Sequence, residues 1–260
     1  MKKVKRGRPV KVSNGFELNL IKMDKMKFNK NLFIPMKTGK SVDRLLSSDR
    51  GLMKGTNTAI IGDPGVGKST VTLDILADLY NRGNKVLFIS GEMTPIDMHG
   101  YVKRYPKFGK LPILFLGDYL DSDPMEVMEC ALNEGYDAVL IDSMAEVGVA
   151  VSDYSKVNGK RAESLILNML EKHNKADNKR KINTSFILIQ QVTKSGNFAG
   201  SNRFKHALTA MGELRFGENG GRFLRFSKNR RGGEMNNLFF NLESKGHVEW
   251  MHMTANNNVF

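Results

Sequence analysis

Cysteine and tryptophan are nearly absent from this chain, which has one of each in 260 residues. Cys130 alone cannot form an internal disulfide or a four-cysteine zinc site within one chain. No run approaches the roughly 20 apolar residues that cross a bilayer, and the basic N-terminus lacks the apolar stretch of a signal peptide. We therefore expect a cytoplasmic protein, with no membrane partner, whose stability comes from its hydrophobic core.

Acidic residues are also scarce relative to basic ones, and the imbalance lies at one end. The chain has 40 Lys and Arg against 27 Asp and Glu, and residues 1–50 hold 14 of the basic residues but only 4 acidic ones. Such a local excess of cations attracts a polyanion, either nucleic acid or anionic lipid. The segment has no long amphipathic helix that would lie on a membrane, so nucleic acid is the expected partner.

The sequence divides into a basic N-terminal arm, residues 1–40, and a folded domain, residues 41–260. The arm has little apolar periodicity, which is typical of a loosely packed segment. Within it, Arg6-Gly7-Arg8-Pro9 resembles the AT-hook, whose arginines lie in the narrow minor groove of A·T-rich DNA. The alternative is a solvated basic tail in which Arg6 and Arg8 make no specific groove contact.

Apolar segments of two kinds alternate from residue 57 onward. Short continuous apolar runs predict buried strands, and stretches between them have helical spacing. This order is typical of an α/β fold with a mostly parallel sheet and helices on both faces. Beyond residue 212, short strands and Gly-rich turns predict an antiparallel extension of that sheet. Strands are expected at residues 58–62, 86–89, 113–116, 138–141, 185–189, 213–216, 222–226, 238–242 and 248–251, and helices at 69–80, after 95, from 124 and at 162–173.

One segment carries a complete phosphate-binding pattern. Residues 62–69, Gly-Asp-Pro-Gly-Val-Gly-Lys-Ser, fit G-x-x-x-x-G-K-[ST] and lie between an expected strand and an expected helix. Glycines let successive backbone N–H groups turn toward phosphate oxygens at the positive end of the helix dipole. Lys68 would reach the β- and γ-phosphates, and the Ser69 hydroxyl would bind Mg²⁺. We expect ATP with Mg²⁺ to bind at Gly62, Asp63, Pro64, Gly65, Val66, Gly67, Lys68, Ser69 and Thr70.

Two acidic residues follow expected strands and could complete such a site. Asp142 comes after the apolar run 138–141, where a carboxylate would orient the magnesium ion, although it could instead cap a loop. Glu92 comes just past the strand at 86–89, where it would position or deprotonate the attacking water. The alternative for Glu92 is an ordinary surface carboxylate.

A wider set of segments fits one family. They are Leu45-Leu46, Gly51-Leu52, Lys54-Gly55, residues 62–69, Ser90-Gly91-Glu92, residues 139–143, Gln191-Val-Thr-Lys194 with Gly196, Ala199-Gly200, and Lys228-Asn-Arg230-Arg-Gly232. Over roughly residues 41–245 the chain resembles the RecA-type ATPases, and most closely the RadA/Sms branch. RadA has Lys-Asn-Arg-Phe-Gly where this chain has Arg231 in place of Phe, and the related DnaB helicases carry a similar Lys-x-Arg-x-Gly. The resemblance implies a RecA-like P-loop fold.

The resemblance also implies roles at the matching positions. Lys228 and Arg230 would reach the γ-phosphate held by a neighbouring subunit, so that hydrolysis depends on assembly. Gln191 would sense the γ-phosphate and relay its loss to a DNA-binding loop at residues 193–203, with a partner loop at 147–161. DNA contacts are then expected at Lys156, Lys160, Arg161, Lys194, Phe198 and Arg203. Alternatively, Lys228 and Arg230 protect a solvated edge strand, and Phe198 packs in the fold.

These features predict a DNA-dependent ATPase of recombination, replication or repair in a bacterial or phage-infected cell. It would bind single-stranded DNA as a homo-oligomer, either a hexameric ring with helicase activity or a filament, together with replication or recombination proteins. One alternative is a nucleotide-switched regulatory ATPase similar to the KaiC branch. A small-molecule P-loop kinase explains neither the Lys-x-Arg-x-Gly segment nor the basic arm. RadA has a zinc module before its ATPase core and a Lon-like domain after it, and we expect neither in this chain.

Overall fold

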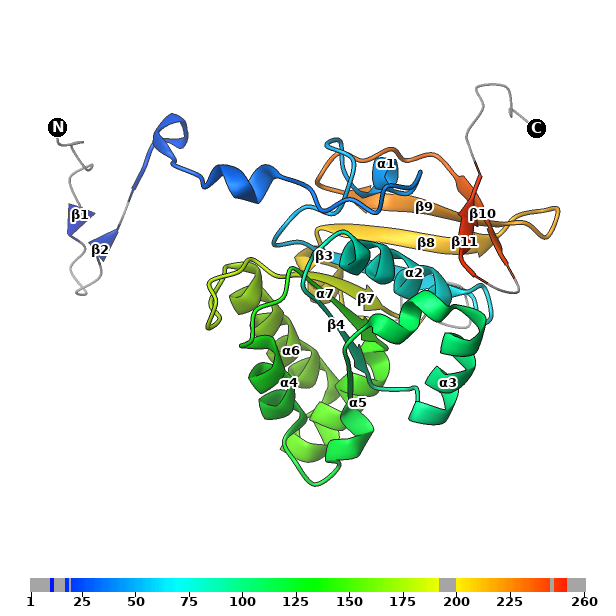
Figure 1. Ribbon diagram of the computed structural model, residues 1–260. Coiled ribbons are helices and arrows are strands. Elements are labelled where there is room, and N and C mark those ends of the chain that lie inside the picture. Colours follow the sequence, from blue (N-terminus) through cyan, green and yellow to red (C-terminus); the bar gives the residue numbers. More distant parts are fainter. Residues whose placement is uncertain (1–9, 12–16, 19, 192–199, 244–245, 252–260) are drawn as a thin grey trace.

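A sheet of nine strands lies at the centre of the fold, in the order β11-β10-β9-β8-β3-β7-β6-β4-β5 (Figure 1). The computed structural model describes residues 10–11, 17–18, 20–191, 200–243 and 246–251. The parallel strands are β3 (Asn57–Gly62), β4 (Val86–Ser90), β5 (Ile113–Phe115), β6 (Ala138–Asp142), β7 (Ser185–Ile189) and β8 (Ala210–Phe216). Strands β9 (Arg222–Asn229), β10 (Leu238–Leu242) and β11 (Val248–Trp250) are antiparallel.

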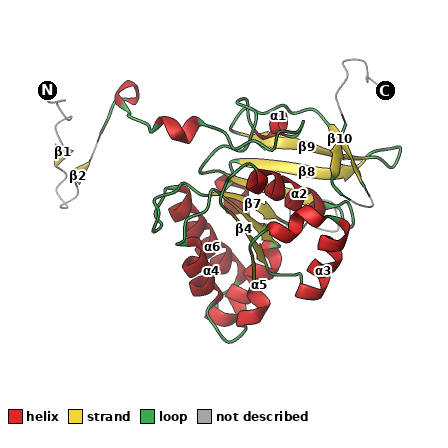
Figure 2. Ribbon diagram, in the orientation of Figure 1, coloured by secondary structure: helices red, strands yellow, loops and turns green. Residues whose placement is uncertain are grey.

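Helices cover both faces of the parallel strands, because successive side chains of a strand point to opposite faces. Ile60, Phe88 and Leu140 share one buried cluster with α2 (Lys68–Asn81), against which α3 (Pro95–Arg104) packs. Their neighbours Ala59 and Leu87 belong to a second cluster on the other face. That face packs against α4 (Pro124–Leu132), α5 (Met144–Ser155), α6 (Gly159–Asn174) and α7 (Asn202–Ala207) (Figure 2). The expected α/β class and antiparallel extension are confirmed.

Two parts of the sequence-based description are wrong. Residues 147–161 are not a loop, since α5 and α6 fill this region and only residues 156–158 join them. Val147 and Val151 lie one turn apart and are fully buried, so apolar contact stabilises α5 despite its β-branched residues. Strand β8 does not begin the antiparallel extension, because it pairs parallel with β3 and antiparallel with β9.

The N-terminal segment leaves the body of the fold as an extended arm (Figure 1). Its described elements are the short strands β1 (Val10–Lys11) and β2 (Glu17–Leu18), and 3-10 helices at Met23–Lys25 and Lys30–Phe33. Several large apolar side chains are exposed here, among them Met23 at 87% and Leu20 at 68%. The chain joins the body at Met36, which is buried and bridges Leu52, and continues into α1 (Asp43–Leu46).

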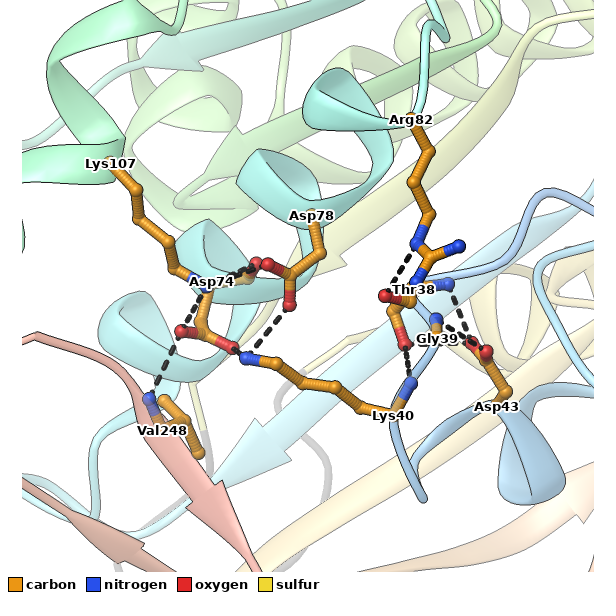
Figure 3. A network of polar contacts seen from close by, with 9 residues as sticks. All are labelled: Thr38, Gly39, Lys40, Asp43, Asp74, Asp78, Arg82, Lys107 and Val248. Carbon is orange, nitrogen blue, oxygen red and sulfur yellow. Dashed lines mark hydrogen bonds and ion pairs between the residues drawn. The ribbon is translucent and has the colours of Figure 1, made fainter.

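A buried ionic network connects the arm to the helix that follows the phosphate loop (Figure 3). Asp74 on α2 is completely buried, and its carboxylate contacts Lys40 Nζ at 2.8 Å and Lys107 Nζ at 2.5 Å. Asp78 pairs with the same two lysines, each at 2.8 Å. Asp74 also accepts a hydrogen bond of 3.0 Å from the backbone N–H of Val248 on β11. The network therefore fixes α2 to the N-terminal segment and to the edge of the sheet.

Further 3-10 helices lie at Pro106–Lys110 and Leu116–Tyr119. Across the described part of the chain, no helix has the length and apolar character required to cross a membrane.

Candidate nucleotide-binding site

The loop between β3 and α2 is shaped to present backbone N–H groups. Gly65 and Gly67 have φ angles of 74° and 100°, which residues with a side chain rarely adopt. A Cβ on Gly62 would lie 2.2 Å from the carbonyl oxygen of Leu214 on β8, so this position also requires glycine. Helix α2 begins at Lys68 without a side-chain cap. Its first N–H groups are therefore available to phosphate oxygens.

Lys68 folds over its own loop. Its Nζ donates hydrogen bonds to the carbonyl oxygens of Gly62 at 2.9 Å and Asp63 at 3.0 Å. Burial lowers the pKa of Lys68, although the carboxylates of Asp142, Asp63 and Glu92 oppose that shift. An ammonium group that is partly desolvated and held by carbonyl oxygens gains strongly from a polyphosphate nearby. The geometry of Lys68 thus fits the role expected from the sequence.

Asp142 and Ser69, the two residues expected to hold Mg²⁺, lie in direct contact. The Ser69 hydroxyl donates to Asp142 Oδ2 at 2.5 Å, and Asp142 is only 3% exposed. Burial raises the pKa of Asp142 to about 6, although the Ser69 hydrogen bond acts in the opposite direction. A buried carboxylate of this kind is stabilised by a bound cation. Among the described residues, no group of three His, Cys, Asp or Glu could hold a metal alone. This pair fits Mg²⁺, which usually takes one or two protein ligands and completes its shell with phosphate and water.

One cavity of about 550 Å³ joins the phosphate loop to Glu92, Asp142 and Gln191. Glu92 and Gln191 follow β4 and β7, and Asp142 is the last residue of β6, which lies between these two strands in the sheet. Because the carboxyl ends of parallel strands meet at one edge, the three side chains converge there. The cavity is lined by Gly62, Pro64, Gly65, Gly67, Lys68, Ser69, Thr70, Glu92, Tyr101, Arg104, Asp142, Ser143, Ile189, Gln191 and Leu242.

Two residues of the expected nucleotide set do not line this cavity. Val66 is completely buried and belongs to the cluster beneath α2, where it holds the loop against the core. Asp63 forms an ion pair of 3.0 Å with Arg215 on β8. Arg215 also lies 3.7 Å from Glu213 on the same strand. Asp63 and Val66 therefore shape the loop from outside the cavity.

Five lining residues were not among the site residues expected from the sequence: Tyr101, Arg104, Ser143, Ile189 and Leu242. Tyr101 and Arg104 lie one turn apart on α3, with the guanidinium carbon 5.0 Å from the centre of the tyrosine ring. Leu242 at the end of β10 lies against the loop, because a Cβ on Gly67 would be 2.7 Å from its Cδ1. Tyr101 and Arg104 could have been predicted near the site, because they lie in the helical segment that directly follows β4 and Glu92. The sequence holds no such signal for Leu242, which is distant along the chain.

Lys228 and Arg230 lie toward the amino ends of the parallel strands, whereas the phosphate loop lies at their carboxyl ends. Lys228 pairs with Met211 on β8, whereas the loop begins after Gly62, which pairs with Leu214. Three residues of extended chain span about 10 Å, and Arg230 lies farther along in the same direction. Neither cation lines the nucleotide cavity. These side chains therefore face a different edge of the molecule from the one that holds their own phosphate loop.

The expected DNA-binding residues fall into three groups. Lys156, Lys160 and Arg161 are exposed at the junction of α5 and α6. Arg203 instead donates from Nη1 to the Ser164 hydroxyl at 2.9 Å and from Nη2 to Asn168 at 3.4 Å, so it fixes α7 to α6. The remaining expected contacts lie outside the described residues: Arg6, Arg8, Lys194 and Phe198.

Sequence comparison finds similarity to bacterial DNA repair proteins. The chain is 28% identical over 206 residues to the DNA repair protein RadA of Mycobacterium tuberculosis, and 30% identical over 204 residues to that of Campylobacter jejuni. These matches include 76% and 75% of this chain, but 40% and 42% of the relatives. The chain thus spans less than half the length of the curated relatives it matches. No protein-family model matches it.

Solved structures with the same fold are more distant in sequence. A KaiC-like protein from Pyrococcus horikoshii has a TM-score of 0.63 at 16% identity, over 84% of this chain and 99% of that protein. The flagellar accessory protein FlaH from Methanocaldococcus jannaschii has a TM-score of 0.60 at 14% identity, over 82% of this chain and 96% of that one. At such identities the likeness defines the fold, a RecA-like sheet with its phosphate loop after β3.

Proposed function

Because the chain is a RecA-type P-loop ATPase related to RadA, we propose that it hydrolyses ATP at sites shared between two copies, in response to single-stranded DNA. The observation that carries the proposal is the convergence of Lys68, Ser69, Asp142, Glu92 and Gln191 on one cavity. Phosphate binding, metal binding and water activation need these groups at one strand edge, and no structural role requires all of them together.

Within the cavity, each group has a distinct part in hydrolysis. The loop N–H groups and Lys68 bind the phosphates and neutralise charge on the leaving ADP. Glu92 accepts a proton from the water whose oxygen bonds to the γ-phosphorus, while the bond from that phosphorus to the β–γ bridging oxygen breaks. Ser69 and Asp142 would hold Mg²⁺, which would supply positive charge to stabilise the phosphates. Gln191 contacts the γ-phosphate side and senses its departure.

The base of the nucleotide would lie against the part of the cavity that α3 lines. There Tyr101 and Arg104 offer a ring face and a guanidinium plane, and Leu242, which lies against Gly67, adds an aliphatic surface beside the phosphate loop. Stacking and cation–π contacts suit the flat ring of a purine better than the smaller pyrimidine ring. This surface supports ATP as the nucleotide and gives α3 a role in binding it.

The second half of the catalytic site would come from another copy. Lys228 and Arg230 carry the Lys-x-Arg-x-Gly pattern but lie at the far end of the sheet from their own cavity. They can therefore stabilise charge on a transferred phosphoryl group only when a second chain presents its cavity to them. The exposed apolar residues of the arm, Leu20 and Met23 among them, support association, since such clusters are uncommon on monomers.

Single-stranded DNA is the proposed regulator. Lys156, Lys160 and Arg161 gather exposed positive charge at the α5–α6 junction, and the basic arm adds more. Cations of this kind bind a phosphate backbone, with an affinity that falls as salt rises. The similarity to DNA repair proteins points to the same ligand.

The test is the steady-state ATPase rate with and without single-stranded DNA over a salt series, with Lys68→Ala as the control. We expect stimulation by DNA that declines as salt increases. Turnover that is indifferent to DNA would favour the second candidate, a nucleotide-switched regulator. The similarity in fold to the KaiC-like protein supports that candidate, since the match includes 99% of the KaiC-like chain. Turnover that survives in Lys68→Ala would contradict the assignment of the cavity itself.

A further inference from the structure

The two proposed catalytic cations are held by the end of a short helix. Lys228 Nζ donates to the carbonyl oxygen of Lys205 at 2.7 Å, and Arg230 Nη2 donates to that of His206 at 3.2 Å. Both carbonyls lie in the last turn of α7, where they have no partner within the helix. The end of α7 therefore provides acceptors that occupy both cations inside their own chain.

The two cations also lie close enough to repel each other. Burial lowers the pKa of Lys228, and the positive charges of Arg230 and Lys205 lower it further. Among the described residues, no carboxylate forms an ion pair with either Lys228 or Arg230. Carbonyl oxygens carry only partial charge, so a phosphate would neutralise this pair far better. A nearby anion can therefore attract Lys228 and Arg230 away from the carbonyl oxygens of α7.

The other end of α7 is fixed to α6. Ser201 caps the helix, because its hydroxyl oxygen accepts from the N–H of Phe204 at 3.1 Å. Glu163 on α6 accepts hydrogen bonds from both the hydroxyl and the backbone N–H of Ser201. Phe204 is 1% exposed and anchors α7 in the core. Glu163 thus holds the cap of the helix whose end holds the two cations, and Arg203 adds hydrogen bonds from the first turn of α7 to Ser164 and Asn168.

There is room for the Arg230 side chain to move. A cavity of about 270 Å³ beside α7 is lined by Arg230, Asn57, Arg203 and His206 among others. The side-chain oxygen of Asn57 is buried there and has no hydrogen-bond partner among the residues that the structure describes. Arg230 can therefore leave the His206 carbonyl without meeting packed side chains.

We propose that α7 with its cap Ser201 is a latch, held by Glu163, that restrains Lys228 and Arg230 until DNA binds. The inference rests on the proposed function, and Glu163 and Ser201 are positioning residues that touch neither nucleotide nor DNA. Lys160 and Arg161 lie in the first turn of α6, close to Glu163. DNA bound at Lys160 and Arg161 opens the latch only if it binds the protein with released cations more tightly than the protein with restrained cations. The freed cations then reach the phosphate in a neighbouring copy.

Glu163→Gln tests the latch, because it removes the charge from the clamp and keeps its size. Without DNA, we expect kcat to rise about tenfold, the factor that corresponds to about 1.4 kcal/mol. The KM for ATP and the DNA-stimulated kcat should stay as in wild type, so that the stimulation ratio falls. Ser201→Ala should act in the same direction, and Ser201→Thr should restore wild-type behaviour. The control is Glu126→Gln, an exposed carboxylate on α4.

A double variant tests whether the DNA-independent gain needs Arg230. In Glu163→Gln combined with Arg230→Ala, the DNA-independent gain should disappear, because the released group is missing. A gain that survives in the double variant would overturn the latch, as would unchanged DNA-free turnover in Glu163→Gln. A fall in both the DNA-free and the stimulated rates would also overturn it, since α7 would then hold the cations in their active position. If wild type itself ignores DNA, the proposed function fails instead.

Discussion

Asp142 offers a prediction in which loss of a functional group stabilises the protein. Its carboxylate is 3% exposed, and burial raises its pKa to about 6 from 3.8. The folded state therefore binds this proton more tightly than the unfolded state does. The resulting destabilisation is absent below the unfolded pKa of 3.8, grows as pH rises between the two values, and is complete above about pH 6.

The size of the effect follows from the same shift. A difference of about two pKa units corresponds to about 3 kcal/mol at neutral pH. Asp142→Asn removes the buried charge and keeps an oxygen that can accept from Ser69, so most of this energy should return as stability. We expect the variant to be about 2–3 kcal/mol more stable than wild type at pH 7.5, and no more stable near pH 4.

Urea unfolding of both proteins at the two pH values, without nucleotide or magnesium, measures the difference. Adding Mg²⁺ and ATP should stabilise wild type and have little effect on the variant, because the variant lacks the metal-binding charge. A variant that is less stable than wild type at pH 7.5 would refute the reasoning. So would a stability gain of equal size at both pH values, since titration of Asp142 would then not be its source.

Three further predictions concern separate parts of the structure. Lys68→Ala should abolish ATP hydrolysis, measured as phosphate release, while circular dichroism and the unfolding midpoint change little. Asp74→Ala should lower the free energy of unfolding by about 3–5 kcal/mol, because it leaves Lys40 and Lys107 close together without their shared buried carboxylate; a loss below 1 kcal/mol in urea titrations would contradict this. Tyr101→Ala should raise the KM for ATP about tenfold with little change in kcat, whereas Tyr101→Phe keeps the ring and should resemble wild type.

The phosphate loop was predictable because all its residues are consecutive. Its pattern specifies the turn, the helix start and the lysine directly. The convergence of Glu92, Asp142 and Gln191 was predictable in a weaker sense. Each follows an apolar strand, and parallel strands bring such positions to one edge of the sheet. Local sequence and a general rule of topology were sufficient for this half of the site.

Features that depend on tertiary contacts could not be predicted from the sequence. Helix α5 lies where the resemblance implies a loop; its sequence contains one Gly and three β-branched Val, and packing against the core stabilises it as a helix. Strand β8 looks like its antiparallel neighbours, and only its pairing with β3 distinguishes it. Arg203 donates a hydrogen bond to Ser164, a partner that no spacing in the sequence indicates.

The central claim, a catalytic site shared between two copies, is tested most directly by mixing two inactive variants. Lys68→Ala lacks a working phosphate loop and keeps its cations, whereas Arg230→Ala has the opposite defect. In a random equal mixture, about a quarter of the interfaces combine the two intact halves, so ATPase activity with DNA should return to about a quarter of the wild-type rate. Lys68→Ala mixed with Asp142→Asn is the control, because both changes damage the same half. Recovery in the first mixture but not the second is the predicted result, and no recovery in either would contradict the account.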